Sequence, residues 1–340
     1  MPKTTPLPAS KATRPLPFGP LDGLLALVTV AWGLNSVAIK YAIGRFHPMV
    51  FNSIRFAYAT ALIFAVMWST EGRRGGLRSI ALPRRDVARV AAIGLVGHFV
   101  YQFLWMTGID LSSAGNTAFI MAVSPVSIAV LSSLFGHDRL NLAAWTGIAL
   151  SLGGVIIVAV GAENSLSFRA ASVHGDMMTL LAVFCWAVYT ITSKPLLDGG
   201  SNGADRYSPI RLTAWTMLFG TIALVTATIP AFPRQDWSAV TPLAWGCLVY
   251  SGAFGLVGPY IVWNYGLERL GPARTGAYHN LTPITTGVFA FLLLGERWTP
   301  LRFAGVAIIL AGVTIVRRAK TASMASGSGR LVIGPGAPTR

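Results

Sequence analysis

GIDLSSAGNTAFIMAVSP, which runs from Gly108 to Pro125, returns 158 residues later as GLERLGPARTGAYHNLTP, from Gly266 to Pro283. The register extends without a gap to either side, and the same shift pairs Gly94 with Gly252, Gly97 with Gly255, Trp105 with Trp263, Asp110 with Glu268, Thr117 with Thr275, Asp138 with Glu296, Arg139 with Arg297, Gly147 with Gly305 and Gly154 with Gly312. Earlier in each half, with small gaps, Trp32 matches Trp186, Lys40 matches Lys194 and Arg55 matches Arg211. The chain is therefore two copies of one unit.

The composition indicates that this unit lies in lipid. Charged residues make up 11% of the chain, hydrophobic residues 53%, and the mean hydropathy is +0.59. Soluble proteins carry about a quarter charged residues, so this chain has too few charges to cover a surface in water. Because backbone groups in lipid need partners within their own segment, an all-α polytopic membrane protein is expected.

The apolar runs predict ten transmembrane helices, since a bilayer core of about 30 Å needs about 20 apolar residues per helix. We place the spans near residues 21–43, 48–68, 87–108, 113–135, 142–160, 175–196, 208–229, 241–267, 272–294 and 300–317. Short polar turns at Asp110–Ser113 and Glu268–Gly271 give the weakest separations. The repeats span residues 18–160 and 172–318, between a disordered basic tail at 1–17 and a disordered tail at 319–340.

Five helices per copy is an odd number, so the two copies enter the membrane with opposite topology. Inverted repeats of this kind are typical of secondary transporters, whose substrate site lies near the midplane between the repeats. With the N-terminus in the cytoplasm, inside segments hold 20 of the 27 Lys and Arg residues. By the positive-inside rule, both termini are therefore expected on the cytoplasmic side of the inner membrane.

The net charge of +15 does not indicate nucleic acid, because the basic residues fall between apolar runs rather than along one amphipathic face. Cys185 and Cys247 both lie in apolar runs, and no CxxC or HExxH spacing occurs, so we expect no metal and no cofactor. The expected partners are the lipid bilayer and a small-molecule substrate, and a homodimer is left open.

The chain resembles the EamA family of the drug/metabolite transporter superfamily. The resemblance rests on the repeat, on AWGLNSVAIK (Ala31 to Lys40) and on LLLGERWTPLRFAGVAIILAGVTIV (Leu292 to Val316). The first-half counterpart of LLGE reads FGHD (Phe135 to Asp138), which departs from the family pattern. The resemblance implies a basket of helices around a cavity lined by the first, third, fourth, sixth, eighth and ninth spans, with the fifth and tenth peripheral.

Polar and aromatic side chains in the predicted spans are the candidates for a substrate cavity, because such groups are costly in lipid unless they face protein or water. They are Trp32, Asn35, Ser36, His98, Tyr101, Gln102, Trp105, Asn116, Trp186, Tyr189, Tyr260, Trp263, Asn264, Tyr278, His279 and Asn280. Aromatic walls with a few amide and hydroxyl groups suit a small zwitterionic or amphipathic solute. The alternatives are packing and interfacial anchoring for Trp and Tyr.

Two further sets of residues come from matching positions of the repeats. Pro125 and Pro283 each remove a backbone hydrogen bond and predict either a hinge or a static kink. The basic residues Lys40, Arg55, Lys194 and Arg211 either reach headgroups and helix ends or contact an anionic substrate.

The leading hypothesis from these observations is a secondary transporter, not an enzyme, that works by alternating access and exports amino acids or related metabolites. A carrier of an anionic metabolite, such as a nucleotide sugar or sugar phosphate, and a membrane-embedded enzyme remain the alternatives. The 12 acidic residues all fall in loops or at span ends, so no carboxylate relay for protons is visible. Coupling through His98 or His279 and uniport or exchange stay open.

Overall fold

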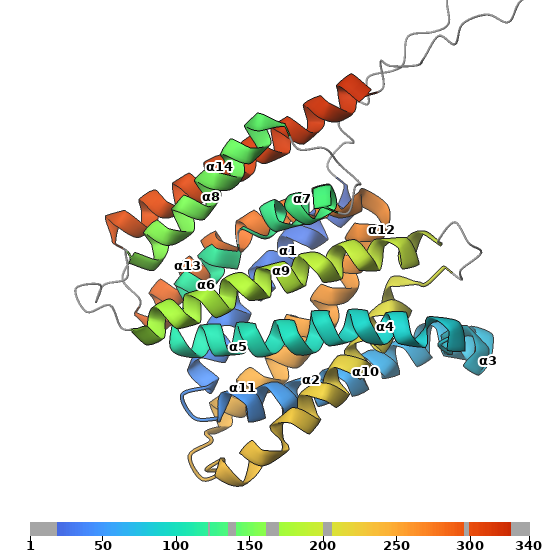
Figure 1. The fold of residues 1–340 in the computed structure, drawn as a ribbon. Coiled ribbons are helices and arrows are strands. Elements are labelled where there is room, and N and C mark those ends of the chain that lie inside the picture. The colour runs from blue at the N-terminus through green and yellow to red at the C-terminus, as the bar shows by residue number, and fades with distance from the viewer. Residues whose placement is uncertain are drawn as a thin grey trace, which may run out of the picture.

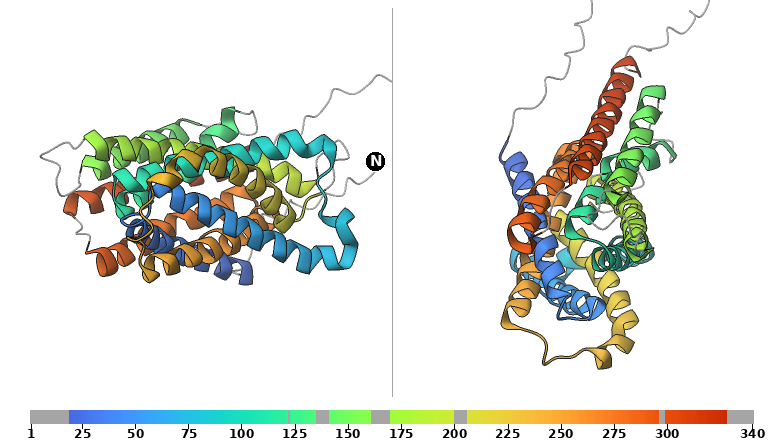
Figure 2. Two further views of the ribbon diagram at one scale, coloured as in Figure 1. Left: turned by 90° about the horizontal axis from the view of Figure 1, so that it is seen from below. Right: turned by 90° about the vertical axis from the view of Figure 1, so that its left-hand side faces the viewer.

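The computed structural model describes residues 19–121, 123–134, 141–160, 170–199, 206–295 and 299–327, and these residues form helices and no strand (Figure 1). The helices are α1 (Pro20–Ala42), α2 (Pro48–Met67), η1 (Trp68–Gly72), α3 (Arg73–Ile80), η2 (Arg84–Asp86), α4 (Val87–Gly94), η3 (Leu95–Val100), α5 (Tyr101–Leu111), α6 (Ala114–Met121), α7 (Ser124–Leu134), α8 (Leu142–Val160), α9 (Ala170–Asp198), α10 (Pro209–Thr228), η4 (Ile229–Arg234), α11 (Pro242–Tyr250), η5 (Ser251–Val257), α12 (Gly258–Tyr278), η6 (His279–Leu281), α13 (Thr282–Leu294) and α14 (Pro300–Gly327). The long helices run largely along one direction, as the left view of Figure 2 shows.

Local sequence signals set where several of these helices begin. α2, α10 and α11 each start with proline, which has no N–H to leave unpaired and a φ angle already suited to a helix. The residue before each proline is a cap: the side chains of His47, Ser208 and Thr241 accept a hydrogen bond from a first-turn N–H.

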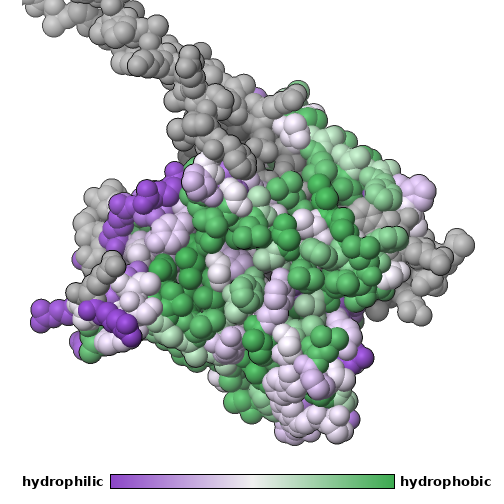
Figure 3. Space-filling view, turned by 180° about the vertical axis from the view of Figure 1, so that it is seen from behind, coloured by the Kyte–Doolittle hydropathy of each residue, from purple (hydrophilic) through white to green (hydrophobic). Residues whose placement is uncertain are grey.

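Six of the helical segments are long and apolar enough to cross a membrane. They are Pro20–Ala42, Pro48–Gly72, Gly75–Leu111, Ser172–Asp198, Pro209–Arg234 and Pro242–Leu270; shorter apolar helices run over Leu142–Gly154, Ile284–Leu294 and Pro300–Gly312. Apolar side chains dominate the face in Figure 3, while hydrophilic residues gather at its edges. The chain therefore has the all-helical, apolar surface expected of a polytopic membrane protein.

The packing of α8 against α14 relates the two halves of the chain. A Cβ on Gly154 would lie 2.8 Å from the Gly305 carbonyl oxygen, and one on Gly312 would lie 2.5 Å from that of Gly147. These are the same two repeat positions with their partners exchanged, and Ser151 Oγ donates to the carbonyl of its own equivalent, Ile309, at 3.4 Å. Such exchange requires α8 and α14 to pack antiparallel. The pair lies along one edge of the bundle (Figure 1).

The fourth helix of each half is interrupted. α6 ends at Met121 and α7 begins at Ser124, and in the second half η6 separates α12 from α13. The turn expected at Glu268–Gly271 falls within α12. A Cβ on Gly266 would lie 2.8 Å from Thr275 Cγ2, although nine residues of straight helix would span about 13.5 Å. The chain therefore turns back on itself between these two residues.

Helix α14 continues to Gly327, beyond the end expected near residue 317. The first residues of the tail predicted to be disordered are therefore helical in the structure. The N-terminal tail at 1–17 and residues 328–340 lie outside the described residues.

The bundle has two ends, each held together by contacts between loops. At the first, which we call the Lys40 end, Gln235 Oε1 accepts a hydrogen bond from His47 N at 2.6 Å and so ties the α10–α11 loop to the α1–α2 loop. At the opposite α3 end, Ser208 Oγ donates to Glu71 at 2.5 Å and Tyr207 donates to Asp86 at 2.7 Å. The middle of the bundle lies between these ends.

Candidate functional site

A cavity of about 50 Å³ lies between the two halves of the bundle. It is lined by Trp32, Asn35, Ser36, Arg55, Tyr101, Gln102, Trp105, Ala118, Met121, Trp186, Gly255, Leu256, Tyr260, His279 and Thr282. Helices α1, α2, α5 and α6 of the first half contribute, together with α9, η5, α12, η6 and α13 of the second. The structure thus brings many of the predicted cavity residues to one place.

Aromatic rings from four helical segments pack together on one side of this cavity. The Trp32 ring centroid lies 4.9 Å from that of His279, 5.5 Å from that of Trp263 and 6.1 Å from that of Trp186. Trp186 also stacks on Tyr189 at 5.3 Å. Rings at these separations pack against one another and hold each other's orientation, so they form a continuous aromatic wall.

Several polar atoms in the cavity wall lack a hydrogen-bond partner among the described residues. They are Asn35 Oδ1, Trp186 Nε1, both ring nitrogens of His279 and Thr282 Oγ1. Buried polar groups are nearly always hydrogen-bonded, because an unpaired one costs about 1–3 kcal/mol. Groups of this kind gathered around one cavity are what a polar ligand would satisfy.

Widened π-helical turns lie beside the cavity at equivalent positions of the two repeats. η3 (Leu95–Val100) and η5 (Ser251–Val257) each contain glycine. π-helical turns often mark functional sites because they disturb the regular hydrogen-bond ladder. Here Trp32 Nε1 donates to the Gly255 carbonyl of η5 at 3.0 Å, which fixes the indole in the wall.

Arg55 is the residue of the cavity wall that carries a full charge. It lies in the interior of α2 and its side chain is completely buried. Its guanidinium donates to Asn52 Oδ1 at 2.6 Å, to Gln102 Oε1 at 2.7 Å and to Ser251 Oγ at 3.0 Å. All three acceptors are neutral, so the positive charge is held in place without being cancelled.

The other predicted cavity residues do not line the cavity: some contact the wall residues on the side away from the cavity, and others lie further away. His98 Nε2 hydrogen-bonds Thr216 Oγ1 at 3.1 Å, and Asn264 donates to Tyr189 Oη at 3.0 Å and to Thr213 at 2.8 Å. Trp263 packs against both Trp32 and His279. Their predicted contact with substrate stays a prediction.

Two more predicted residues contact buried carboxylates nearer the ends of the bundle. Asn116 donates to Asp176 at 3.5 Å, and Tyr278 donates to Asp22 at 2.5 Å. The side chain of Asn280 lies outside the described residues.

The predicted hinge prolines both lie where a helix begins. Pro125 is the second residue of α7 and Pro283 the second residue of α13, directly after the two interruptions. A proline tolerates the first turn of a helix because the N–H it lacks would have no partner there. Both a hinge and a static kink fit this position, so movement at the two prolines stays a prediction.

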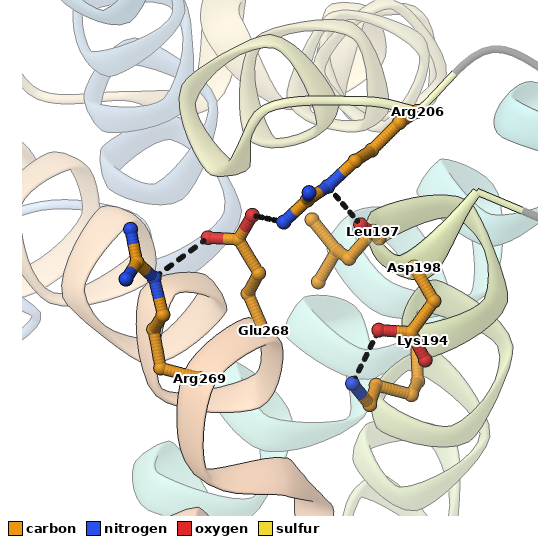
Figure 4. Close-up of polar contacts among 6 residues, drawn as sticks. All are labelled: Lys194, Leu197, Asp198, Arg206, Glu268 and Arg269. Carbon is orange, nitrogen blue, oxygen red and sulfur yellow. Dashed lines mark hydrogen bonds and ion pairs between the residues drawn. The ribbon is translucent and has the colours of Figure 1, made fainter.

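The remaining basic residues lie outside the cavity lining. Lys40 Nζ donates to the carbonyls of Ile109 at 2.6 Å, Asp110 at 3.0 Å and Ser112 at 2.6 Å, and so caps the end of α5. Its repeat equivalent Lys194 instead pairs with Asp198 at 2.5 Å, while Arg206 bridges to Glu268 at 2.5 Å (Figure 4).

Arg211, the repeat equivalent of Arg55, is at the α3 end. Its guanidinium donates to the carbonyl oxygen of Ala81 and lies 4.6 Å above the ring of Tyr207. The two arginines therefore match in sequence but differ in their contacts, because one lines the cavity and the other joins α10 to the segment after α3.

Sequence reasoning did not single out several residues of this site. Asn52 and Ser251 hold Arg55, and Ala118, Met121 and Leu256 complete the wall. The one available signal was that Asn52 and Arg55, three residues apart, share a face of an otherwise apolar helix. The apolar members carry no such signal.

Comparison with known proteins identifies the kind of fold and function. The sequence model of the EamA-like transporter family matches residues 21–160 and again residues 173–318. The two matches together cover most of the chain and divide it into two copies, as the internal repeat does.

Several relatives cover most of the chain. A protein of Archaeoglobus fulgidus named an uncharacterized transporter is 29% identical over 87% of this chain and 98% of its own. A "probable terminal-alkyne amino-acid exporter" of Streptantibioticus cattleyicolor is 27% identical over 86% of this chain and 92% of its own. A "probable amino-acid metabolite efflux pump" of Escherichia coli is 26% identical over 86% and 94%.

A solved crystal structure shares the fold. It superimposes with a TM-score of 0.64 at 18% sequence identity, covering 89% of this chain and 98% of its own.

Proposed function

This chain belongs to the EamA-like transporter family, and we propose that it is a secondary transporter that exports an amino acid or a related small metabolite by alternating access. The observation that carries the proposal is the cavity between the two halves, with its aromatic wall and its unpartnered polar atoms. The exporter and efflux names of two relatives support the direction and the substrate class.

We place the protein in the inner membrane as ten transmembrane helices in two inverted five-helix repeats, with both termini in the cytoplasm. The antiparallel contact of α8 with α14 supports inversion, since these are the fifth helices of the two halves. The basic residues of α3 and its surroundings support a cytoplasmic α3 end. The Lys40 end then faces outward.

The size of the cavity supports a conformational change during transport. The free space of about 50 Å³ between the side chains suits a few water molecules rather than an amino acid, so we infer that the walls move apart when substrate binds. The interruptions before Pro125 and Pro283 are suitable places for such movement, because a broken helix can bend there without losing further hydrogen bonds.

A second candidate, a carrier of sugar phosphates or nucleotide sugars, is favoured by Arg55 in the cavity wall. Among the described wall residues, however, Arg55 is the single lysine or arginine, and a phosphate monoester carries about −1.5 to −2 at neutral pH. One guanidinium matches one carboxylate better. We therefore rank the amino-acid exporter first.

Counterflow in proteoliposomes tests the proposal. Vesicles loaded with one unlabelled compound at a time, drawn from amino acids, nucleosides, sugar phosphates and aromatic amines, are diluted into the same compound carrying a radiolabel. We expect saturable accumulation of label with an amino acid inside. Accumulation that never saturates would indicate a channel, and its absence with every compound would contradict the proposal.

Trp105→Ala is expected to lower this counterflow rate at least ~10-fold, because Trp105 lines the cavity and orients what binds there. Phe103→Ala is the matched control on the same helix, since Phe103 is 44% exposed on the outward face. Size-exclusion profiles verify that both variants fold, and Trp105→Phe, which keeps a ring, should fall between them. Equal rates for Trp105→Ala and Phe103→Ala would remove Trp105 from the transport site.

A further inference from the structure

The buried charge of Arg55 is the least explained feature of the cavity. A charge within a membrane-embedded bundle is costly unless it is paired or faces a polar cavity, and such residues usually mark a substrate path. Arg55 is completely buried, so it cannot extend to water or headgroups. Its position in the wall of the cavity is therefore not explained by anchoring to the membrane surface.

The groups around Arg55 orient it but do not neutralise it. Asn52, Gln102 and Ser251 accept hydrogen bonds from its terminal nitrogens, and its Nε–H has no acceptor among the described residues. The ion pairs found in the described part of the chain involve other residues. Aromatic rings complete the surroundings, with the Phe56 centroid at 5.4 Å and that of Trp105 at 5.9 Å.

A second unpartnered atom in the same wall has the opposite hydrogen-bonding character. Asn35 Oδ1 is a buried acceptor without a donor among the described residues. Asn35 lines the cavity with Trp32 and Trp186, and indole rings attract cations. The wall thus offers one cationic donor and, separately, neutral acceptors that include Asn35 Oδ1 beside aromatic rings. An α-amino acid has the complementary pair, a carboxylate and an ammonium group.

We propose that Arg55 binds the carboxylate of the substrate, that Asn35 and the Trp32–Trp186 wall receive its ammonium group, and that the substrate is an α-amino monocarboxylate. This assignment rests on the proposed transport function and narrows it to a chemical class. The substrate supplies the counter-charge that the protein lacks, in a site shielded from water where such a pair is strong. Asn52, Gln102 and Ser251 act as positioning residues that aim the guanidinium.

Binding to the purified protein in detergent tests the assignment apart from transport. Thermal stabilisation is measured with each of the twenty proteinogenic amino acids, then with the carboxamide and the N-acetyl derivative of the one that stabilises most. We expect the amino acid to bind at least ~30-fold more tightly than either derivative, because each derivative leaves one buried group unpaired. Stabilisation by none of the twenty, or equal binding of the carboxamide, would overturn the proposal.

Variants then locate the carboxylate. Arg55→Gln should weaken binding of the amino acid at least ~30-fold and leave binding of its carboxamide unchanged, while Arg55→Lys, which keeps the charge, should retain part of the affinity. The Arg55→Lys variant also keeps the test open if the glutamine variant fails to fold. Arg211→Gln is the matched control, since it removes the equivalent arginine of the other half and should bind like the unaltered protein. An Arg55→Gln protein that binds within threefold of normal would refute the assignment.

Counterflow separates this proposal from the transport function. If the unaltered protein carries an amino acid and Arg55→Gln carries it equally well, transport stands and the role of Arg55 falls. If binding depends on Arg55 but no compound shows counterflow, the carboxylate site stands and the transport proposal falls.

Discussion

Replacing Gly94 by alanine is expected to destabilise the folded protein by about 3 kcal/mol, the upper part of the range for overpacking a close contact. A methyl group at this position would overlap the carbonyl oxygen of Thr216 and lie 3.0 Å from its carbonyl carbon. These are backbone atoms of α10, so no side-chain rotation can relieve the clash. Helices α4 and α10 would have to separate, which would also stretch the hydrogen bond from His98 to Thr216. The apparent unfolding temperature in detergent measures the effect.

Two other glycines serve as controls for this prediction. Gly252 is the repeat equivalent of Gly94, but its added methyl would meet the side chain of Tyr58, which can turn away. Gly246 has nothing within 4 Å of an added methyl, and alanine there gains up to about 1 kcal/mol of helix propensity. We expect stability to rank Gly246→Ala above Gly252→Ala above Gly94→Ala. If Gly94→Ala were as stable as Gly246→Ala, the close approach of α4 and α10 would be wrong.

The glycines also show how much of the architecture could be predicted from the sequence. The register that pairs Gly147 with Gly305 and Gly154 with Gly312 predicted two copies, and the structure brings those same positions together in the α8–α14 contact. A repeat with a fixed register is visible in sequence because equivalent positions keep equivalent residues. The all-helical, apolar character followed from composition for a similar reason. The number of membrane spans does not follow as firmly, because short turns separate long apolar runs.

The side on which each polar residue lies is harder to predict from one sequence. Asn35 and Gln102 were singled out because a buried amide is costly without a partner, and both line the cavity. For Arg55 the sequence allows both a membrane anchor and an anion contact, since it does not show which face of α2 packs inward. For Lys40 the sequence allows the same two alternatives, and the structure shows its ammonium group capping the end of α5. These outcomes depend on helix rotation and on contacts distant in sequence, which periodicity does not determine.

Replacing Lys40 by methionine is expected to open the Lys40 end of the cavity and to increase labelling from that side by about 10-fold or more. In the structure the Lys40 ammonium joins α1 to the last carbonyls of α5 through three hydrogen bonds. Hydrogen bonds to a charged group contribute about 1.5–3 kcal/mol, and losing even one such contribution changes a two-state population by about 10-fold or more. Lys194, its repeat equivalent, pairs with Asp198 instead of with backbone carbonyls of α12.

Because Lys40 and Lys194 have different contacts, their replacement should change the labelling in opposite directions. If the repeats exchange conformations during transport, the opposite state has Lys194 on the carbonyls near Glu268 and Lys40 released, so Lys194→Met should reduce labelling from the Lys40 side. The label is an impermeant maleimide on Ser36→Cys, in a protein whose Cys185 and Cys247 are replaced by alanine. Arg45→Met is the control, because Arg45 lies at the same end but over the ring of Tyr41. Equal labelling of the Lys40, Lys194 and Arg45 variants would mean that the two lysines do not stabilise closure of the two ends of the cavity. Alternating access would then depend on other contacts.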